Sequence, residues 1–180
     1  MIALLGVPMV ARSASIDESP LAGEAATEYL ERILGAKLRA IGLGGMREFR
    51  GALVADTVVI APDGELVGKP SDDQDAAAIL MRLGGATHEV TTRFLLAEGG
   101  ERDGDVAHAQ TVTTRVTFRE LFPGELQAYV ATGEGRDKAG AYAVQGGAAA
   151  FVERIDGSYT NVVGLPLSEV VVAMRRLGWL

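Results

Sequence analysis

Lysine is rare in this chain, and its positions point to possible anion chemistry. The 17 basic residues include only three lysines, at positions 37, 69 and 138. A lysine ammonium is a compact charge with three donors and suits a phosphate, whereas the guanidinium of arginine is planar and bulkier. Lys37 lies in a predicted helix, Lys69 in a Gly-Lys-Pro segment and Lys138 in an Asp-Lys-Ala-Gly segment. We therefore take the lysines as candidate ligand-binding residues, with chance placement as the alternative.

Two charged residues interrupt apolar patterns where a charge is costly. Asp56 lies at the centre of the apolar run 52–61, which is typical of a strand covered on both faces. A buried carboxylate needs a counter-charge or a bound cation. Lys37 falls within the apolar stripe of a predicted helix, between Ile33 and Ile41. Its side chain must either extend to solvent or face an anion.

The stretch 137–169 combines many small residues with isolated polar ones. Glycine and alanine let a backbone approach a ligand closely, and sparse polar side chains can orient that ligand. The polar candidates in this stretch are Asp137, Lys138, Tyr142, Gln145, Ser158, Tyr159 and Asn161.

Composition excludes several classes of function. The chain has no cysteine, which excludes disulfides and thiolate metal sites and favours a cytoplasmic location. A net charge of -7 argues against a nucleic-acid partner. No apolar run is long enough to span a membrane, and no signal peptide is expected at the N-terminus. With only two histidines, any metal is expected to be a hard cation on carboxylates.

The hydrophobic pattern predicts a mixed α/β chain without internal repeats. We expect Ser71 to cap the second helix and Pro166 to open the last one. The predicted helices cover residues 19–44, 71–83, 123–132 and 166–177, and the predicted strands cover 52–61, 65–67, 88–97 and 108–118, with a hairpin tip at 98–105 and a tight turn into a further strand near 146–152.

Several of these motifs together resemble the Maf family of nucleoside triphosphate pyrophosphatases. The resemblance lies in Asp137–Glu169, the helix Tyr29–Ala40, and the segments Ile16-Asp17-Glu18, Ala55-Asp56-Thr57-Val58-Val59, Gly68-Lys69-Pro70 and His88-Glu89-Val90. It implies one Maf-like domain over residues 1–180. The implied fold is α/β, with a mixed β-sheet flanked by helices and two lobes around a deep cleft, as in Maf and inosine-triphosphatase-like proteins. A homodimer is also implied.

The resemblance assigns roles to six residues. It makes Asp56 the proton acceptor, and places Glu18 and Asp56 at a divalent cation, Mg²⁺ or Mn²⁺. The cation would bridge phosphate oxygens. The remaining roles are phosphate binding by Lys37 and Lys69, and base selection by Thr57 and Gln145.

The segment Asp137–Tyr142, followed by Val144-Gln145-Gly146, resembles the branch that acts on dTTP and UTP. The expected reaction releases a nucleoside monophosphate and pyrophosphate, with modified pyrimidine nucleotides as further possible substrates. One alternative is a preference for 7-methyl-GTP or another nucleotide. The other is a catalytically weak nucleotide-binding regulator of septum formation.

The chain departs from the family pattern at its start. The family has a strand and a Ser-x-x-Arg-Arg segment ahead of the run that corresponds to Leu5-Gly6-Val7-Pro8. A start codon assigned too late, a shortened chain and a degenerate family member are the three explanations. The first is favoured because every downstream motif is intact. Smaller departures are Ala143, where glycine is usual, and Ala86, where arginine is common.

Overall fold

The computed structural model describes residues 5–42, 49–99 and 105–180. The helices and strands, in chain order, are α1 (Ala26–Ile41), β1 (Gly51–Ile60), β2 (Leu66–Val67), α2 (Asp73–Leu83), β3 (Thr87–Glu98), β4 (Val106–Phe118), α3 (Pro123–Ala131), β5 (Val152–Asp156), α4 (Tyr159–Val162) and α5 (Leu167–Arg176), with 3₁₀ helices η2 (Ala139–Ala141) and η3 (Gly147–Phe151). Most predicted elements are confirmed within a few residues. The expected hairpin tip falls mainly on residues 100–104, outside the described part of the chain.

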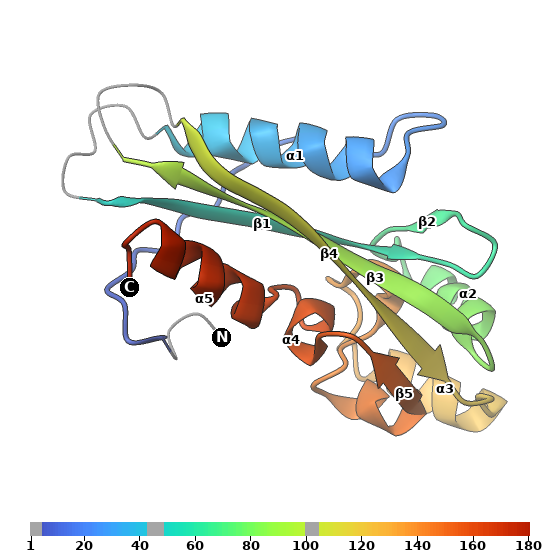
Figure 1. The fold of residues 1–180 in the computed structure, drawn as a ribbon. Helices are drawn as coiled ribbons and strands as arrows, with labels where there is room; N and C mark the ends of the chain where they lie inside the picture. Colours follow the sequence, from blue (N-terminus) through green and yellow to red (C-terminus); the bar gives the residue numbers. More distant parts are fainter. Residues whose placement is uncertain (1–4, 43–48, 100–104) are drawn as a thin grey trace. The chain divides into compact units, whose positions relative to one another are not determined.

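The five strands form one sheet in the order β2-β1-β3-β4-β5. Val59 pairs with Val67 across β1 and β2, and Val116 pairs with Ile155 across β4 and β5; both pairings are antiparallel. The arrows of β1, β3 and β4 alternate in direction (Figure 1). The sheet is therefore antiparallel, and the expectation of a mixed sheet is wrong. Strands β1 and β2, and strands β3 and β4, follow each other directly in the chain, whereas longer connections that include helices join β2 to β3 and β4 to β5.

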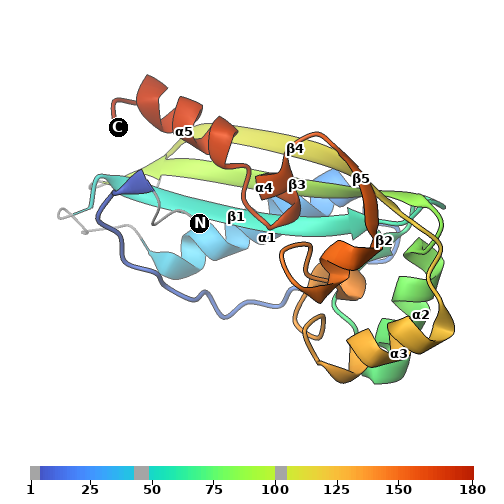
Figure 2. The ribbon, with the colours of Figure 1, turned by 90° about the horizontal axis from the view of Figure 1, so that it is seen from below.

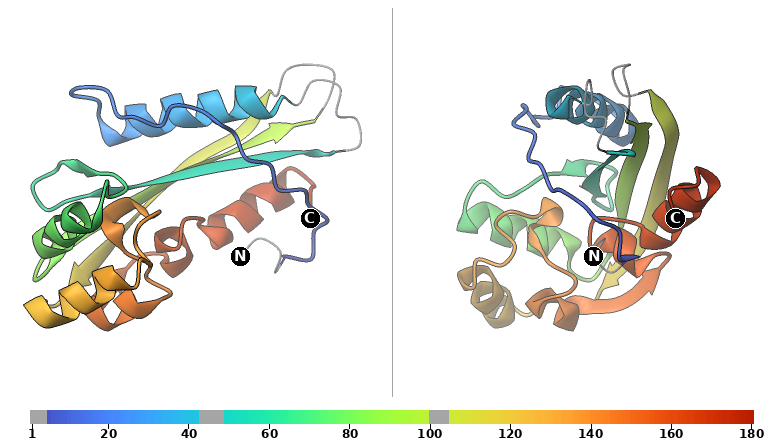
Figure 3. Two further views of the ribbon diagram at one scale, coloured as in Figure 1. Left: turned by 180° about the vertical axis from the view of Figure 1, so that it is seen from behind. Right: turned by 90° about the vertical axis from the view of Figure 1, so that its left-hand side faces the viewer.

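The chain divides into two compact units, and the division falls within β1, β3 and β4. Unit 1 contains residues 1–56, 92–112 and 164–180, and unit 2 contains residues 57–91 and 113–163. In unit 1, α1 and α5 cover opposite faces of the sheet (Figure 3). Apolar side chains of the strands pack against α1 on one face and against α5 on the other. The prediction that residues 52–61 form a strand covered on both faces is confirmed for the part in unit 1.

Unit 2 contains the larger apolar core. In this unit α2 packs against α3 and η2, and the two helices lie side by side in Figure 2. Phe118, Tyr129, Tyr142 and Phe151 place their rings in contact with one another. The buried core continues through apolar residues of the sheet and of both helices, among them Val59, Val67, Leu80, Leu83, Val90, Val116 and Leu126.

Two helix starts differ from the predictions. The first helix begins at Ala26 rather than near Ser19, because the chain turns at Gly23 with a φ of 74°. The second is capped by Asp72, whose side chain accepts a hydrogen bond from the Asp75 amide. Ser71 instead donates its own amide to Asp75 Oδ2. No helix in the described part of the chain is long and apolar enough to cross a lipid bilayer.

Candidate active site

The alternation of β1 determines the face on which Asp56 lies. Val54 packs against Leu34 of α1, whereas Leu53 and Ala55 pack in the cluster that includes α5. Successive side chains of a strand point to opposite faces. Asp56 therefore shares the face of Val54, and its carboxylate lies on the side of the sheet that α1 covers.

Lys37 reaches that carboxylate from α1. Its Nζ lies 2.8 Å from Asp56 Oδ1 and 2.8 Å from Glu18 Oε1. The three side chains are 16%, 18% and 32% exposed for Lys37, Asp56 and Glu18 respectively. Of the two alternatives for Lys37, the structure shows the second: the ammonium faces anions. Burial disfavours the charged ammonium, but hydrogen bonds to Asp56 and Glu18 outweigh it and raise the pKa of Lys37.

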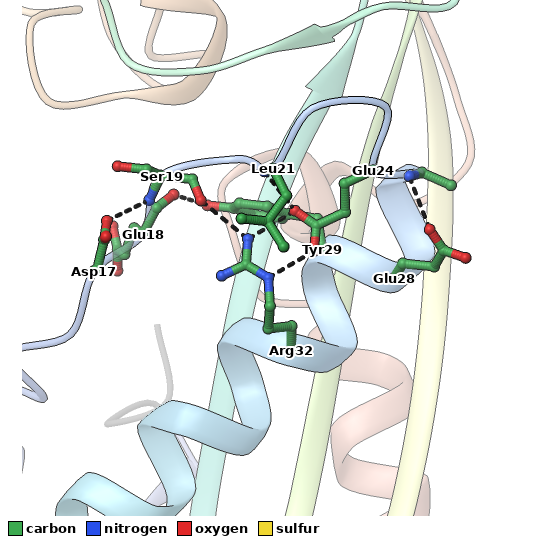
Figure 4. Close-up of polar contacts among 9 residues, drawn as sticks. Asp17, Glu18, Ser19, Leu21, Glu24, Glu28, Tyr29 and Arg32 are labelled. Atoms are coloured by element: carbon green, nitrogen blue, oxygen red, sulfur yellow. Dashed lines mark hydrogen bonds and ion pairs between the residues drawn. The ribbon is translucent and has the colours of Figure 1, made fainter.

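Glu18 is held in place by the helix that follows it (Figure 4). The Tyr29 hydroxyl donates to the Glu18 carbonyl oxygen at 2.9 Å, and Arg32 Nη2 donates to the Ser19 carbonyl oxygen at 3.0 Å. Asp17 Oδ1 accepts the Ser19 amide at 2.9 Å and so caps the turn that follows it. Burial first, and the nearby Asp56 and Glu18 carboxylates next, raise the pKa of Tyr29 to about 12. The phenol therefore stays protonated and keeps donating at neutral pH.

The three charges of Lys37, Glu18 and Asp56 form a site with one excess negative charge. A half-buried carboxylate can accept a proton from an attacking water. Two carboxylates also suit Mg²⁺, which proteins bind through one or two carboxylates together with substrate phosphates. The described residues contain no cluster of three or more acidic or histidine ligands, so a cation here would need oxygens from the substrate and from water.

The mutual pairing also supplies a structural reason for the two interior charges. Lys37 neutralises Asp56 and joins α1 to β1. An ion pair of this kind can serve the fold alone. The convergence of Glu18 on the same ammonium distinguishes this site from such a pair.

Lys69 and Lys138 lie in one neighbourhood of unit 2. The Gly140 amide donates to the Gly68 carbonyl oxygen at 3.1 Å, which places the Gly-Lys-Pro segment beside η2. Lys138 Nζ lies 2.6 Å from Asp137 Oδ1. The hydrogen bond from Lys138 is the main cause that lowers the pKa of Asp137, and the charge of Lys69 adds to it. The structure thus brings together two of the three lysines, while Lys37 belongs to unit 1.

An open depression of about 580 Å³ begins one residue after Lys69. Pro70, Ser71, Asp72, Asp73, Gln74 and Arg136 line it. Its one guanidinium is already engaged, because Arg136 Nη2 lies 2.8 Å from Asp73 Oδ2. The lining therefore contributes no unpaired positive charge for an anion.

Thr57 and Gln145 lie in different settings. Thr57 follows Asp56 in β1, and strand alternation places its side chain on the opposite face, which it shares with the core residue Val59. Gln145 is exposed at the tip of a turn closed by the Gly146 amide, which donates to the Ala143 carbonyl oxygen at 3.0 Å. The role of both residues in base selection remains a prediction.

The loop that leads to Gln145 is folded tightly on itself. Gly135 is buried, and a Cβ on it would lie 2.0 Å from the Ala141 carbonyl oxygen. Ala141 itself has a φ of 58°, an uncommon value for a residue other than glycine. Such strain persists only where the surroundings enforce it.

Sequence reasoning did not find Tyr129 and Glu134, which contact this loop. Tyr129 accepts the Ala143 amide, and Glu134 accepts the Gly147 amide. One signal was available for Glu134, since it stands between two glycines, where an isolated acidic side chain can reach nearby backbone. Nothing in the local sequence marks Tyr129, because its partner is 14 residues away.

Three polar residues of the stretch 137–169 make hydrogen bonds within the fold: Tyr142 and Asn161 are buried, and Ser158 is half-buried. Asn161 is fully buried and donates to the Val90 carbonyl oxygen at 2.9 Å and to Thr114 Oγ1 at 3.0 Å. Ser158 caps α4. The Tyr142 hydroxyl lies 2.9 Å from His88 Nε2 in the buried core. The structure thus gives each of these residues a role in the fold, and their role in orienting a ligand stays a prediction.

His88 lies near the start of β3 and hydrogen-bonds within the core. Its side chain is 1% exposed, and its ring meets that of Phe118 edge to face with centroids 4.9 Å apart. Burial lowers the pKa of His88 to about 4. The imidazole is therefore neutral in the folded protein at neutral pH.

Known proteins resemble the chain along nearly its whole length. Residues 1–177 match the family described as Maf-like protein. A protein of Geobacter sulfurreducens, named dTTP/UTP pyrophosphatase, is 47% identical over 178 residues, which cover 99% of this chain and 90% of the relative. Proteins with the same name are 46% identical in Hahella chejuensis and 41% identical in Pelotomaculum thermopropionicum, with 86% and 88% of those relatives covered. The match covers 99% and 97% of this chain.

Proposed function

Because the chain belongs to the Maf family, we propose that it is a nucleoside triphosphate pyrophosphatase that hydrolyses dTTP and UTP. The products would be the nucleoside monophosphate and pyrophosphate. One structural observation supports the chemistry most directly. The Asp56 carboxylate is half-buried, and one of its oxygens accepts a hydrogen bond from Lys37. The same Lys37 ammonium also pairs with Glu18.

In the proposed reaction, Asp56 removes a proton from a water that attacks the α-phosphorus. The bond from the α-phosphorus to its bridging oxygen breaks, and pyrophosphate leaves. Lys37 holds Asp56 Oδ1, so we assign the transferred proton to Oδ2. Fixing the carboxylate by one oxygen orients the other toward the substrate and limits its motion.

Lys37 and Lys69 supply positive charge for the phosphate chain. A compact ammonium that donates to two carboxylates has three donors in all, so one remains for a phosphate oxygen. The site alone carries more negative than positive charge, so a triphosphate would be repelled without further cations. A divalent cation, Mg²⁺ or Mn²⁺, held by Glu18 and Asp56 would neutralise phosphate oxygens and stabilise the charge that develops on them.

Thr57 and Gln145 are the proposed base-selecting residues. The glutamine carboxamide both donates and accepts hydrogen bonds. The hydrogen-bonding edge of uracil or thymine also presents a donor between acceptors. An exposed Gln145 at the tip of a turn suits such an edge.

Three further parts of the proposal rest on the family resemblance. The chain would form a single functional domain whose nucleotide binds in a deep cleft between two lobes. It would be a homodimer, and it would act in the cytoplasm. Light scattering on the purified protein measures directly whether it is a homodimer.

The test is pyrophosphate release from a panel of nucleoside triphosphates with Mg²⁺, with Mn²⁺ and with EDTA. We expect turnover of dTTP and UTP in preference to CTP and 7-methyl-GTP. Removal of a general base typically costs 10²- to 10⁴-fold, so Asp56→Asn should lose roughly that much. Asp63→Asn is the matched control, because Asp63 is an exposed carboxylate paired with Arg82.

Each other outcome has a defined meaning. Unchanged turnover in Asp56→Asn would exclude the proposed role of Asp56. Preference for 7-methyl-GTP would replace the pyrimidine specificity. Nucleotide binding without turnover in the unmutated chain would favour the regulator of septum formation.

A further inference from the structure

The turn that carries Gln145 is fastened on both sides by side chains of one neighbouring segment. On one side, the Ala143 amide donates to the Tyr129 hydroxyl at 3.0 Å. On the other side, the Gly147 amide donates to Glu134 at 2.9 Å for Oε2 and 3.2 Å for Oε1. The two anchored amides thus flank Gln145 along the chain.

Tyr129 and Glu134 are also neighbours, so the two anchors are coupled. The Tyr129 hydroxyl accepts the Ala143 amide and lies within the influence of the Glu134 carboxylate. Burial mainly, and the Glu134 carboxylate in addition, raise the pKa of Tyr129 and keep it protonated. The Tyr129 side chain is 6% exposed, and its ring packs against Phe151 with centroids 5.2 Å apart. The anchors are therefore themselves immobilised by the core of unit 2.

Glycines allow this close approach. A Cβ on Gly146 would lie 2.0 Å from Glu134 Oε1, and a Cβ on Gly147 would lie 3.4 Å from the Tyr129 ring. Any side chain at position 146 would push the carboxylate away. Glycine at position 146 is thus favoured by the contact with Glu134 and not only by the turn, whereas a Cβ at position 147 would make a close van der Waals contact.

The side chain of Gln145 is exposed, and no hydrogen-bond partner for it occurs among the described residues. The backbone of the turn therefore sets the position of its Cα and the region that its carboxamide can reach. That backbone is fixed by Ala143 and Gly147, and hence by Tyr129 and Glu134.

We propose that Tyr129 and Glu134 are positioning residues for base selection, which act by holding the turn that presents Gln145. This inference rests on the proposed function, because it takes Gln145 as the residue that reads the base. Tyr129 and Glu134 do not touch the nucleotide in this scheme. Loosening the turn lets the backbone at Gln145 move, so the carboxamide reaches the pyrimidine edge less often and recognition weakens while proton abstraction at Asp56 continues.

The test compares UTP with CTP, whose bases differ in donor and acceptor pattern at one edge. Selectivity is measured as the ratio of kcat/KM values and, separately, as the ratio of Kd values by calorimetry in EDTA. We expect Glu134→Ala to reduce the preference for UTP about tenfold, which corresponds to about 1.4 kcal/mol. The loss should appear mainly in KM for UTP. Glu134→Gln retains an acceptor for Gly147 and should keep most of the preference.

Glu125→Ala is the matched control. Glu125 is also a glutamate near the surface, and it accepts hydrogen bonds from Arg119 and from the Phe122 amide. Its removal costs comparable hydrogen bonds without touching the turn. It should leave the ratio of UTP to CTP unchanged.

Amide hydrogen exchange separates the inference from the proposed function. Gly147 should exchange faster in Glu134→Ala, and Ala143 should exchange faster in Tyr129→Phe, in protein that remains folded. Unchanged exchange at these amides would overturn the anchoring. Faster exchange with unchanged ratios of kcat/KM and Kd would overturn the role in base selection. If the unmutated chain lacks turnover, the proposed function fails, while exchange and the Kd ratio still decide this inference.

Discussion

Lys37 and Asp56 are 19 residues apart in the chain, and their charged atoms lie 2.8 Å apart. Each reaches the other through the regular geometry of its element. Lys37 lies on the stripe of α1 that contacts the sheet, and Asp56 lies on the face of β1 that α1 covers. Glu18 adds a second carboxylate to the same ammonium, so two carboxylates and one ammonium from three separate segments meet at this site.

Replacement of Lys37 by methionine should destabilise the protein and couple to Asp56. Breaking a buried ion pair typically costs 3–5 kcal/mol, and partial exposure reduces this, so we expect about 2 kcal/mol from Lys37→Met. In the Asp56→Asn background the same replacement should cost about 1 kcal/mol less. Urea denaturation of the four proteins at neutral pH measures the difference.

The exposed pair of Arg82 and Asp63 provides the comparison for this cycle. Their side chains are 35% and 55% exposed, so Arg82→Met should cost less than about 1 kcal/mol. Additive costs for Lys37→Met and Asp56→Asn would show that the 2.8 Å contact does not stabilise the fold.

His88 should make folding stability fall in mild acid. Its pKa is lowered by burial from 6.5 to about 4 in the folded chain. The unfolded chain therefore binds a proton first as the pH falls, and the contribution present above the unfolded pKa is lost between about pH 6.5 and about pH 4. We expect about 2 kcal/mol of this loss between about pH 7 and about pH 5.

Denaturant titrations of His88→Gln across that range measure the effect. The variant should start less stable, because a buried ring is removed, but should lack the acid-dependent component. His108→Gln is the natural control, since these are the only two histidines. An unaltered pH slope in His88→Gln would assign the loss to other groups.

Asp72, and not Ser71, should stabilise the start of α2. Asp72→Ala removes the side chain that accepts the Asp75 amide at 2.8 Å, and loss of such a cap typically costs about 1 kcal/mol. Ser71→Ala removes only a longer contact of 3.2 Å to Asp75 and should cost a few tenths of a kcal/mol. Thermal unfolding of both variants checks the order, and equal or reversed losses would contradict the assignment of the cap.

The sequence was sufficient to predict a helix or strand where the apolar residues follow a regular helical spacing or form a continuous run. The helical spacing around Lys37 and the apolar run around Asp56 predicted a helix and a strand, and both occur. The same reasoning required each charge to find a counter-charge. It could not identify Lys37 and Asp56 as partners of each other, because the sequence does not show which face of the strand packs against α1.

Prediction failed where a residue's hydrogen-bond partner lies far away in the chain, or where two neighbouring residues could both cap a helix. Asn161 resembles a ligand-facing residue in sequence, but its amide serves Val90 and Thr114 in other segments. The choice of Asp72 over Ser71 as the helix cap depends on one backbone rotation, which neighbouring residues with similar capping preference do not specify. Tyr129 was missed because it acts through a hydroxyl at the end of a core ring.

The crossing of Gly135 over Ala141 has a consequence for how this enzyme family can diversify. A side chain at Gly135 would require displacement of the backbone at Ala141, and therefore of the turn that follows it. Substituting Gln145 alone changes one side chain that contacts the base but leaves the backbone of the turn as it is. Residues 133–147 should behave as a cassette, so that a new base preference is acquired by exchanging the segment as a whole.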